Sequence, residues 1–130
     1  MVKLLLRGGK LKREETRKGG SGMSDLAHRK CEPCEGGTKP LDEDTVKEYI
    51  SQVDGWEHRD GVIEKTFTFK NYYHTTAFVN AVAWIAHRED HHPDIEFGYK
   101  ECTVRFSTHA IGGLSDNDFI CAAKVDALIG

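Results

Sequence analysis

Three histidines and several carboxyl and hydroxyl side chains lie close together in the second half of this 130-residue chain. The set comprises Asp90, His91, His92, Ser107, Thr108, His109 and Asp118. Imidazole is the side chain whose unperturbed pKa lies closest to neutral. An adjacent pair of histidines with a third one downstream is therefore typical of general acid and base catalysis at cellular pH.

The pair His91 and His92 is expected at the end of a helix. Pro93 disfavours helical geometry at His92, so the helix should stop near that residue. A rigid helix end can direct both imidazoles into a cleft. The alternative is that each histidine only interacts with the dipole at the helix C-terminus.

His109 is expected at the end of a strand, where a single histidine is more often a surface residue than a catalyst. The hydroxyls of Ser107 and Thr108 beside it can hold a polar ligand. Asp118 follows Ser115 by three positions, which is the spacing of a capping box at a helix start. The cap can be the whole role of Asp118, or the same carboxylate can also orient an imidazole.

Zinc binding is the alternative chemistry for these residues. Three histidines and an aspartate are adequate zinc ligands, but adjacent histidines are not the usual i, i+4 arrangement of a helical zinc site. Cys31 and Cys34 supply only half of a cysteine quartet, and Cys102 and Cys121 are too far apart to form the usual second pair. We therefore expect no metal.

The pattern between these motifs predicts alternating helices and hairpins. Asp60-Gly61 is a strong two-residue turn signal between strands at 56–59 and 62–69, and 95–99 with 102–108 predicts a second hairpin. Helices are expected over 42–53, from an Asn71 cap to about 92, and from Ser115 onward. Inward-facing residues of the two later helices and the last strand are Phe78, Val82, Ile85, Cys102, Val104, Phe106, Phe119, Ala122 and Ala123. Two hairpins between helices indicate one antiparallel sheet covered on one face by helices.

Composition indicates a single soluble domain, which we expect over 41–130 after a flexible basic tail and leader at 1–40. Residues 1–22 carry seven basic and two acidic groups, whereas the remainder carries 11 basic and 19 acidic groups. The acidic body argues against nucleic-acid binding. We interpret 1–22 as an extension from cloning or a wrongly assigned start, with Met23 as the native start; a basic regulatory arm is the alternative.

No apolar run approaches the ~20 residues of a membrane-spanning helix. Leu4-Leu5-Leu6 is far too short for a signal-peptide core. A cytoplasmic location with free thiols is therefore expected.

Several motifs resemble those of pterin-4a-carbinolamine dehydratases. They are Asp90-His91-His92-Pro93, Ser107-Thr108-His109, Gly113-Leu114-Ser115 with Asp118, Gly55-Trp56, and Phe67-Thr68-Phe69-Lys70-Asn71. Their order and spacing agree with the family over roughly residues 31–128, and Cys31-Glu32-Pro33-Cys34 resembles the leader of bacterial members. In one departure, the family usually has a glutamate at position 87, where this chain has His87, with Glu89 nearby.

The resemblance implies an α+β fold with three helices over one face of a four-stranded antiparallel sheet, in the order α-β-β-α-β-β-α. It implies dehydration of 4a-hydroxytetrahydropterin to quinonoid dihydropterin, the step that recycles tetrahydrobiopterin for aromatic amino acid hydroxylases. It also implies no metal, no nucleotide or other cofactor, and a homodimer or homotetramer. A small-molecule pterin is then the partner, rather than a nucleic acid or a membrane.

Loss of water from the carbinolamine requires a proton on the leaving hydroxyl and removal of one from the neighbouring ring nitrogen. His91 and His109 are assigned to this acid and base work, in either order. His92 is expected to complete the catalytic set by binding and orienting the pterin. Asp90, Ser107 and Thr108 are expected to line the site, and Asp118 to orient a histidine. Trp56 is either a wall of the pocket or a core residue.

A non-catalytic dimerisation or protein-binding module of the same fold is the second hypothesis. Animal members of the family also serve as dimerisation cofactors of a homeodomain transcription factor. A helical face that self-associates can bind a partner helix instead. The Cys-x-x-Cys leader favours the enzyme.

Overall fold

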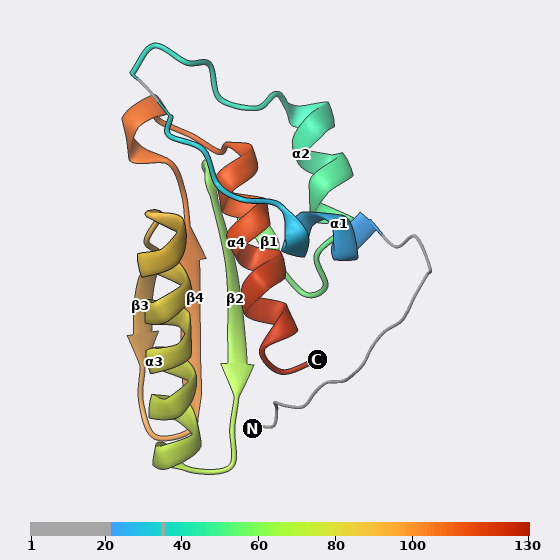
Figure 1. Cartoon of the computed structure of the whole chain (residues 1–130). Coiled ribbons are helices and arrows are strands. Elements are labelled where there is room, and N and C mark those ends of the chain that lie inside the picture. The colour runs from blue at the N-terminus through green and yellow to red at the C-terminus, as the bar shows by residue number, and fades with distance from the viewer. Residues whose placement is uncertain (1–21, 35) are drawn as a thin grey trace.

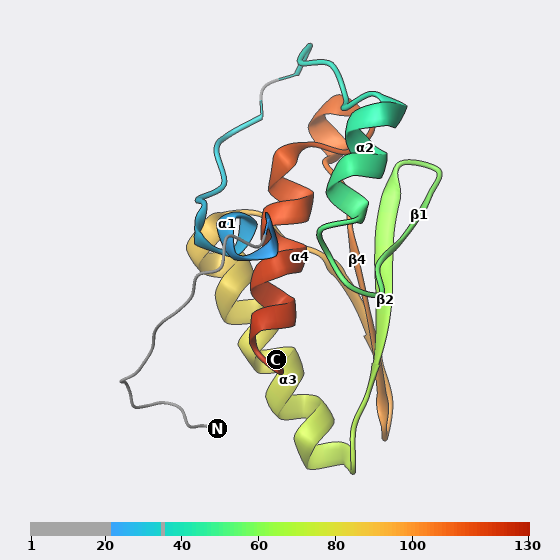
Figure 2. The same cartoon turned by 90° about the vertical axis from the view of Figure 1, so that its right-hand side faces the viewer.

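The computed structural model describes residues 22–34 and 36–130, and its framework is a four-stranded antiparallel sheet with strand order β1-β2-β4-β3 (Figure 1). The strands are β1 (Glu57–Arg59), β2 (Val62–Thr68), β3 (Asp94–Phe97) and β4 (Glu101–Phe106). The helices are α1 (Gly22–His28), α2 (Glu43–Ile50), α3 (Tyr72–Glu89) and α4 (Asp116–Ala127), with a short 3-10 turn, η1 (His109–Ile111). The helices lie on one face of the sheet (Figure 2). The expected α+β fold is therefore confirmed.

The two hairpins form where the sequence predicts them. Asp60 and Gly61 have φ angles of 53° and 76°, as a two-residue turn between right-twisted strands requires. In β4, Cys102, Val104 and Phe106 are buried and alternate with less buried residues. This alternation directs one face of β4 into the core beneath the helices.

Helix α3 begins at the predicted cap and ends earlier than expected. The Asn71 side chain accepts a hydrogen bond from the His74 backbone N–H. The helix ends at Glu89 because Asp90 takes a left-handed conformation, with φ 53°. The backbone N–H of His91 still donates to the Ala86 carbonyl at 3.1 Å, so the end of α3 holds His91 in a fixed position.

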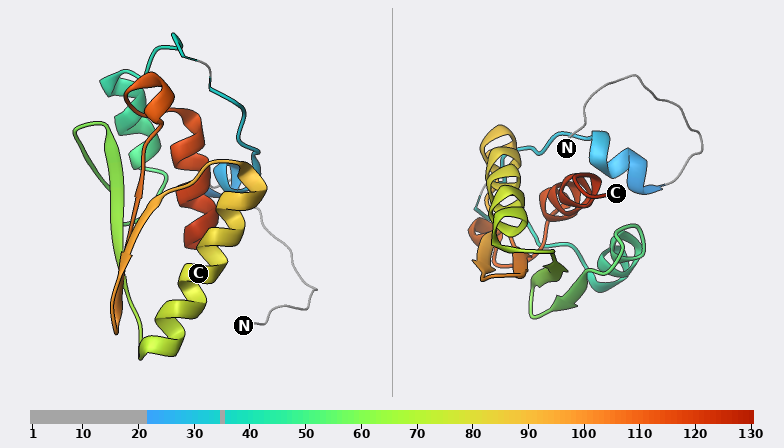
Figure 3. Two further views of the ribbon diagram at one scale, coloured as in Figure 1. Left: turned by 90° about the vertical axis from the view of Figure 1, so that its left-hand side faces the viewer. Right: turned by 90° about the horizontal axis from the view of Figure 1, so that it is seen from below.

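Helix α4 lies at the centre of the molecule, between the sheet and α1 (Figure 3). Its buried residues run almost without interruption: Asn117, Asp118, Phe119, Ile120, Cys121, Ala122, Ala123 and Val125. A helix that is buried on nearly all sides belongs to the core rather than the surface. Its first turn closes the predicted capping box between Ser115 and Asp118.

The N-terminal part of the described chain differs from the sequence prediction. Irregular chain is expected over 23–40, with the ordered domain starting near Leu41, but α1 packs on α4 and its Leu26 side chain is only 2% exposed. Lys124 also donates to the Ala27 carbonyl at 2.7 Å. The prediction is therefore wrong for α1, because a seven-residue helix shows no apolar period and is stabilised by packing.

The expected basic extension at 1–22 lies outside the described residues, apart from Gly22. Within residues 22–34 and 36–130, none of the helices has the length and apolar character needed to cross a membrane.

Candidate active site

A cavity of about 520 Å³ opens where the end of α3, the end of β4 and η1 meet. All six residues expected to bind substrate line it: Asp90, His91, His92, Ser107, Thr108 and His109. The structure thus brings together two histidine motifs whose nearest histidines, His92 and His109, lie 17 positions apart in the chain. A cavity of this volume is within the usual range for sites that bind small molecules.

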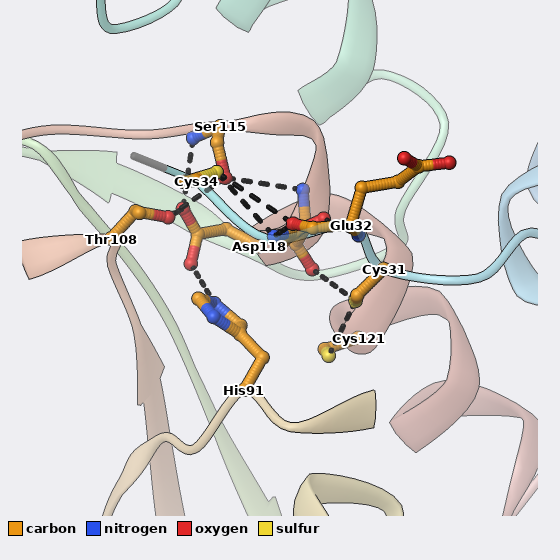
Figure 4. A network of polar contacts seen from close by, with 9 residues as sticks. Cys31, Glu32, Cys34, His91, Thr108, Ser115, Asp118 and Cys121 are labelled. Atoms are coloured by element: carbon orange, nitrogen blue, oxygen red, sulfur yellow. Dashed lines mark hydrogen bonds and ion pairs between the residues drawn. The ribbon is translucent and has the colours of Figure 1, made fainter. Parts of the chain in front are cut away.

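His91 and Asp118 form a short polar pair at the site (Figure 4). The His91 Nε2 lies 2.6 Å from Asp118 Oδ1, and the Asp118 side chain is 0% exposed. A carboxylate only accepts hydrogen bonds, so the imidazole proton lies on Nε2 in the neutral ring. The remaining ring nitrogen, Nδ1, then keeps its lone pair and can accept a proton.

Asp118 is also part of the helix cap. Its Oδ2 accepts from the Thr108 hydroxyl at 2.8 Å and from the Ser115 backbone N–H at 2.9 Å. The two roles that the sequence leaves open for Asp118 therefore coexist in the structure. The start of α4 and the orientation of His91 depend on the same carboxylate.

The His91 ring is further fixed by the core. It stacks on Phe106 with the ring planes 9° apart and the centroids 5.9 Å apart. Phe106 is the last residue of β4 and is buried. The imidazole is thus held by an aromatic face and a carboxylate, and little rotation is left to it.

His109 and His92 reach the cavity from exposed positions. His109 opens η1, which returns the chain through Gly112, at φ 70°, to a bridge between Thr108 and Gly113. The Thr108 backbone N–H donates to the Gly113 carbonyl at 2.9 Å. This tight loop fixes the backbone that carries His109.

Residues 31–34, which we call the leader, form a cavity wall that the sequence does not predict. Cys31, Glu32, Pro33 and Cys34 all line the cavity. Asn117 in α4 also lines it and is bonded to the leader. The only sequence signal for this wall is the likeness of the leader to that of bacterial family members.

Glu89, rather than His87, lies at the site. The Glu89 side chain is 6% exposed, lines the cavity, and lies 3.8 Å from the Lys124 ammonium group. His87 is exposed and packs its ring on Trp84. The acidic group near the histidine pair thus comes from a position two residues later than in the family pattern.

Trp56 belongs to the core and is not among the residues that line the cavity. Its indole N–H donates to the Asp126 carboxylate at 3.1 Å, and its ring packs edge-on against Phe67. Of the two roles left open for Trp56, the structure therefore supports the core role.

All four cysteines are free thiols. The Cys31 and Cys121 sulfurs lie 3.5 Å apart, and this hydrogen bond, followed by burial, raises the pKa of Cys121. Burial raises the pKa of Cys102 to about 11. Among residues 22–34 and 36–130, no three His, Cys, Asp or Glu side chains are grouped so that they could hold a metal ion.

Comparison with known proteins gives a consistent result. Residues 39–128 match the family model described as pterin 4 alpha carbinolamine dehydratase. A protein of Nitrosospira multiformis named "Putative pterin-4-alpha-carbinolamine dehydratase" is 59% identical over 106 residues, covering 82% of this chain and 94% of its own length. A protein of the same name from Nitrosomonas eutropha is 59% identical over 108 residues, covering 82% of this chain and 96% of its own.

A solved structure is also similar. It is described as a transcriptional coactivator/pterin dehydratase from Brucella melitensis. Its TM-score is 0.68 at 30% sequence identity, over 71% of this chain and all of the Brucella chain.

Proposed function

This chain belongs to the pterin 4 alpha carbinolamine dehydratase family, and we propose that it catalyses the dehydration of 4a-hydroxytetrahydropterin to quinonoid dihydropterin and water. The observation that carries the proposal is the pairing of His91 with the buried Asp118 at a cavity that His92 and His109 also line. Asp118 is buried at the start of α4, so the pair is built into the core.

In the proposed reaction, His91 acts as the base. Its Nδ1 accepts the proton from the ring nitrogen beside the carbinolamine carbon, and the electron pair left on nitrogen forms the new carbon–nitrogen double bond. The hydroxyl leaves as water after it accepts a proton from His109. Asp118 stabilises the imidazolium that forms on His91, since its Oδ1 lies 2.6 Å from Nε2.

His109 suits the acid role because it is exposed beside the cavity and can regain its proton from solvent. Each such proton transfer contributes on the order of 10²–10⁴-fold to the rate. His92, Asp90 and Ser107 are proposed to hold the pterin. The Thr108 hydroxyl donates its hydrogen to Asp118. Its proposed role is therefore to position that carboxylate.

The test follows the spectral decay of a chemically prepared 4a-carbinolamine with and without the protein. His91→Ala and His109→Ala should each lower the catalysed rate by about 10²–10⁴-fold with an unchanged circular dichroism spectrum. His74→Ala is the matched control, because His74 is exposed in the first turn of α3. Wild-type rates in both site variants would contradict the acid and base assignment.

The same assay tests the second hypothesis. The Brucella protein is described both as a transcriptional coactivator and as a pterin dehydratase. Wild-type protein that leaves the decay unaccelerated would favour a binding module over an enzyme.

We further propose that the enzyme acts in tetrahydrobiopterin recycling in the cytoplasm as a homodimer or homotetramer. Light scattering on the protein as it elutes from a size-exclusion column would measure its mass. A monomeric mass would contradict the proposed homodimer or homotetramer.

A further inference from the structure

One wall of the cavity comes from outside the region that matches the family model. That match begins at residue 39, whereas the leader at 31–34 lines the cavity. We infer that the leader is a substrate-binding wall for a flat bicyclic ligand and that Asn117 is the residue that positions it. The inference rests on the proposed function, because the ligand that it concerns is the pterin.

Asn117 holds the leader with both ends of its side-chain amide. Its Oδ1 accepts from the Glu32 backbone N–H at 3.0 Å, and its Nδ2 donates to the Glu32 carbonyl at 2.6 Å. The second Nδ2 hydrogen faces the Cys34 sulfur at 3.5 Å. Asn117 is 7% exposed. Both of its amide hydrogens are thus used within the protein, which makes it a positioning residue rather than a ligand of the substrate.

A second anchor ties the leader to the end of α3. The Glu89 carboxylate accepts a hydrogen bond from the Cys31 backbone N–H at 2.9 Å. The Cys31 thiol lies 3.7 Å from the Asn117 carbonyl oxygen and 3.5 Å from the Cys121 sulfur. In Figure 4 the leader passes the start of α4, where the Asn117 side chain binds it. The leader is therefore hydrogen-bonded to the end of α3, which positions His91, and to the start of α4, which contains Asp118.

The wall adds contact area rather than chemistry. Pockets for small molecules bury 70–90% or more of the ligand surface. The leader supplies Glu32, Pro33 and Cys34 as part of that enclosure. Displacing it should weaken binding while leaving the proton transfers at His91 and His109 intact. An interaction that substrate and transition state share changes KM rather than kcat.

The test compares Asn117→Ala with wild-type protein and with the control Asn80→Ala. Asn80 is an exposed residue of α3 and is not among those that line the cavity. The dissociation constant of 7,8-dihydropterin is measured by calorimetry, and kcat and KM are measured by carbinolamine decay. In Asn117→Ala we expect Kd and KM to rise by about five- to thirtyfold. The value of kcat and its pH profile should stay close to those of wild-type protein.

Hydrogen exchange provides a direct readout of the wall. The Glu32 amide should exchange faster in Asn117→Ala, because its acceptor is removed. Pro33→Gly is a second variant that leaves every hydrogen bond of Asn117 in place and should also raise Kd and KM.

Unchanged Kd and KM in both variants, with an active wild-type protein, would overturn the role of the leader and leave the dehydratase proposal intact. Wild-type protein that neither binds dihydropterin nor accelerates the decay would overturn both.

Discussion

Replacing Asp118 by asparagine tests the central pair of the site directly. An asparagine amide can keep its oxygen toward Thr108 and Ser115, where Oδ2 of the aspartate accepts two hydrogen bonds. Its NH₂ group then faces Nε2 of His91, where Oδ1 now lies. The imidazole must move its proton to Nδ1 to accept from that NH₂ group. The nitrogen proposed to act as the base is thereby blocked.

The expected stability loss follows from the three hydrogen bonds. Hydrogen bonds to charged groups contribute roughly 1.5–3 kcal/mol and neutral ones about 0.5–1.5 kcal/mol. Relief of the cost of burying the Asp118 charge offsets part of the difference, so Asp118→Asn should lose about 1–3 kcal/mol. A domain with a stability of about 5–15 kcal/mol remains folded after such a loss. The expected effect on kcat is larger, a fall of about 10²–10⁴-fold.

Three measurements separate these effects. Urea unfolding gives the stability, carbinolamine decay gives kcat, and NMR of ¹⁵N-labelled histidine reports which ring nitrogen of His91 carries the proton. Asp116→Asn is the matched control, because it removes the same charge two residues earlier from an exposed pair with Arg29 and should cost at most about 1 kcal/mol. A wild-type kcat in Asp118→Asn, or a proton on Nδ1 of the wild-type ring, would refute the reasoning.

Three further outcomes are expected. Trp56→Phe removes the hydrogen bond to Asp126 and should lower the free energy of unfolding by about 1.5–3 kcal/mol. The value of kcat should not change, because Trp56 lies in the core. A large loss of kcat would instead indicate that Trp56 contributes to the active site. Cys102, with its pKa raised to about 11 by burial, has little thiolate at pH 8, so iodoacetamide should label it only after unfolding in urea, as peptide mass spectrometry would show. EDTA should leave the rate unchanged, and chelator-sensitive activity would revive the zinc hypothesis.

Local signals in the sequence were sufficient for most of the sheet and its helices. The turn at Asp60-Gly61, the Asn71 cap and the capping box at Ser115 each depend on residues within a few positions of one another, and each is present. The alternation in β4 likewise identified its buried face. Such features are readable because their energetics are local.

Contacts between distant segments have no local signal in the sequence. The sequence gives no sign that Glu89 accepts from Cys31, 58 positions away, or that Asn117 holds Glu32 across 85 positions. Helix α1 was missed because Leu26 is buried by packing on α4 rather than by a pattern of its own. Only the family resemblance indicated that the two histidine motifs meet, since neither motif specifies its partner.

The attachment of the leader to α3 and α4 has a consequence for shortened versions of the protein. A polypeptide cut to the matched region, residues 39–128, would keep every histidine of the cavity. It would lose the hydrogen bonds from the Cys31 and Glu32 backbone N–H groups to Glu89 and Asn117. It would also lose the buried Leu26 side chain from the core. Weak catalysis by such a fragment would therefore result from the loss of these contacts. Kinetic comparisons between family members are meaningful only when their N-terminal segments are equally complete.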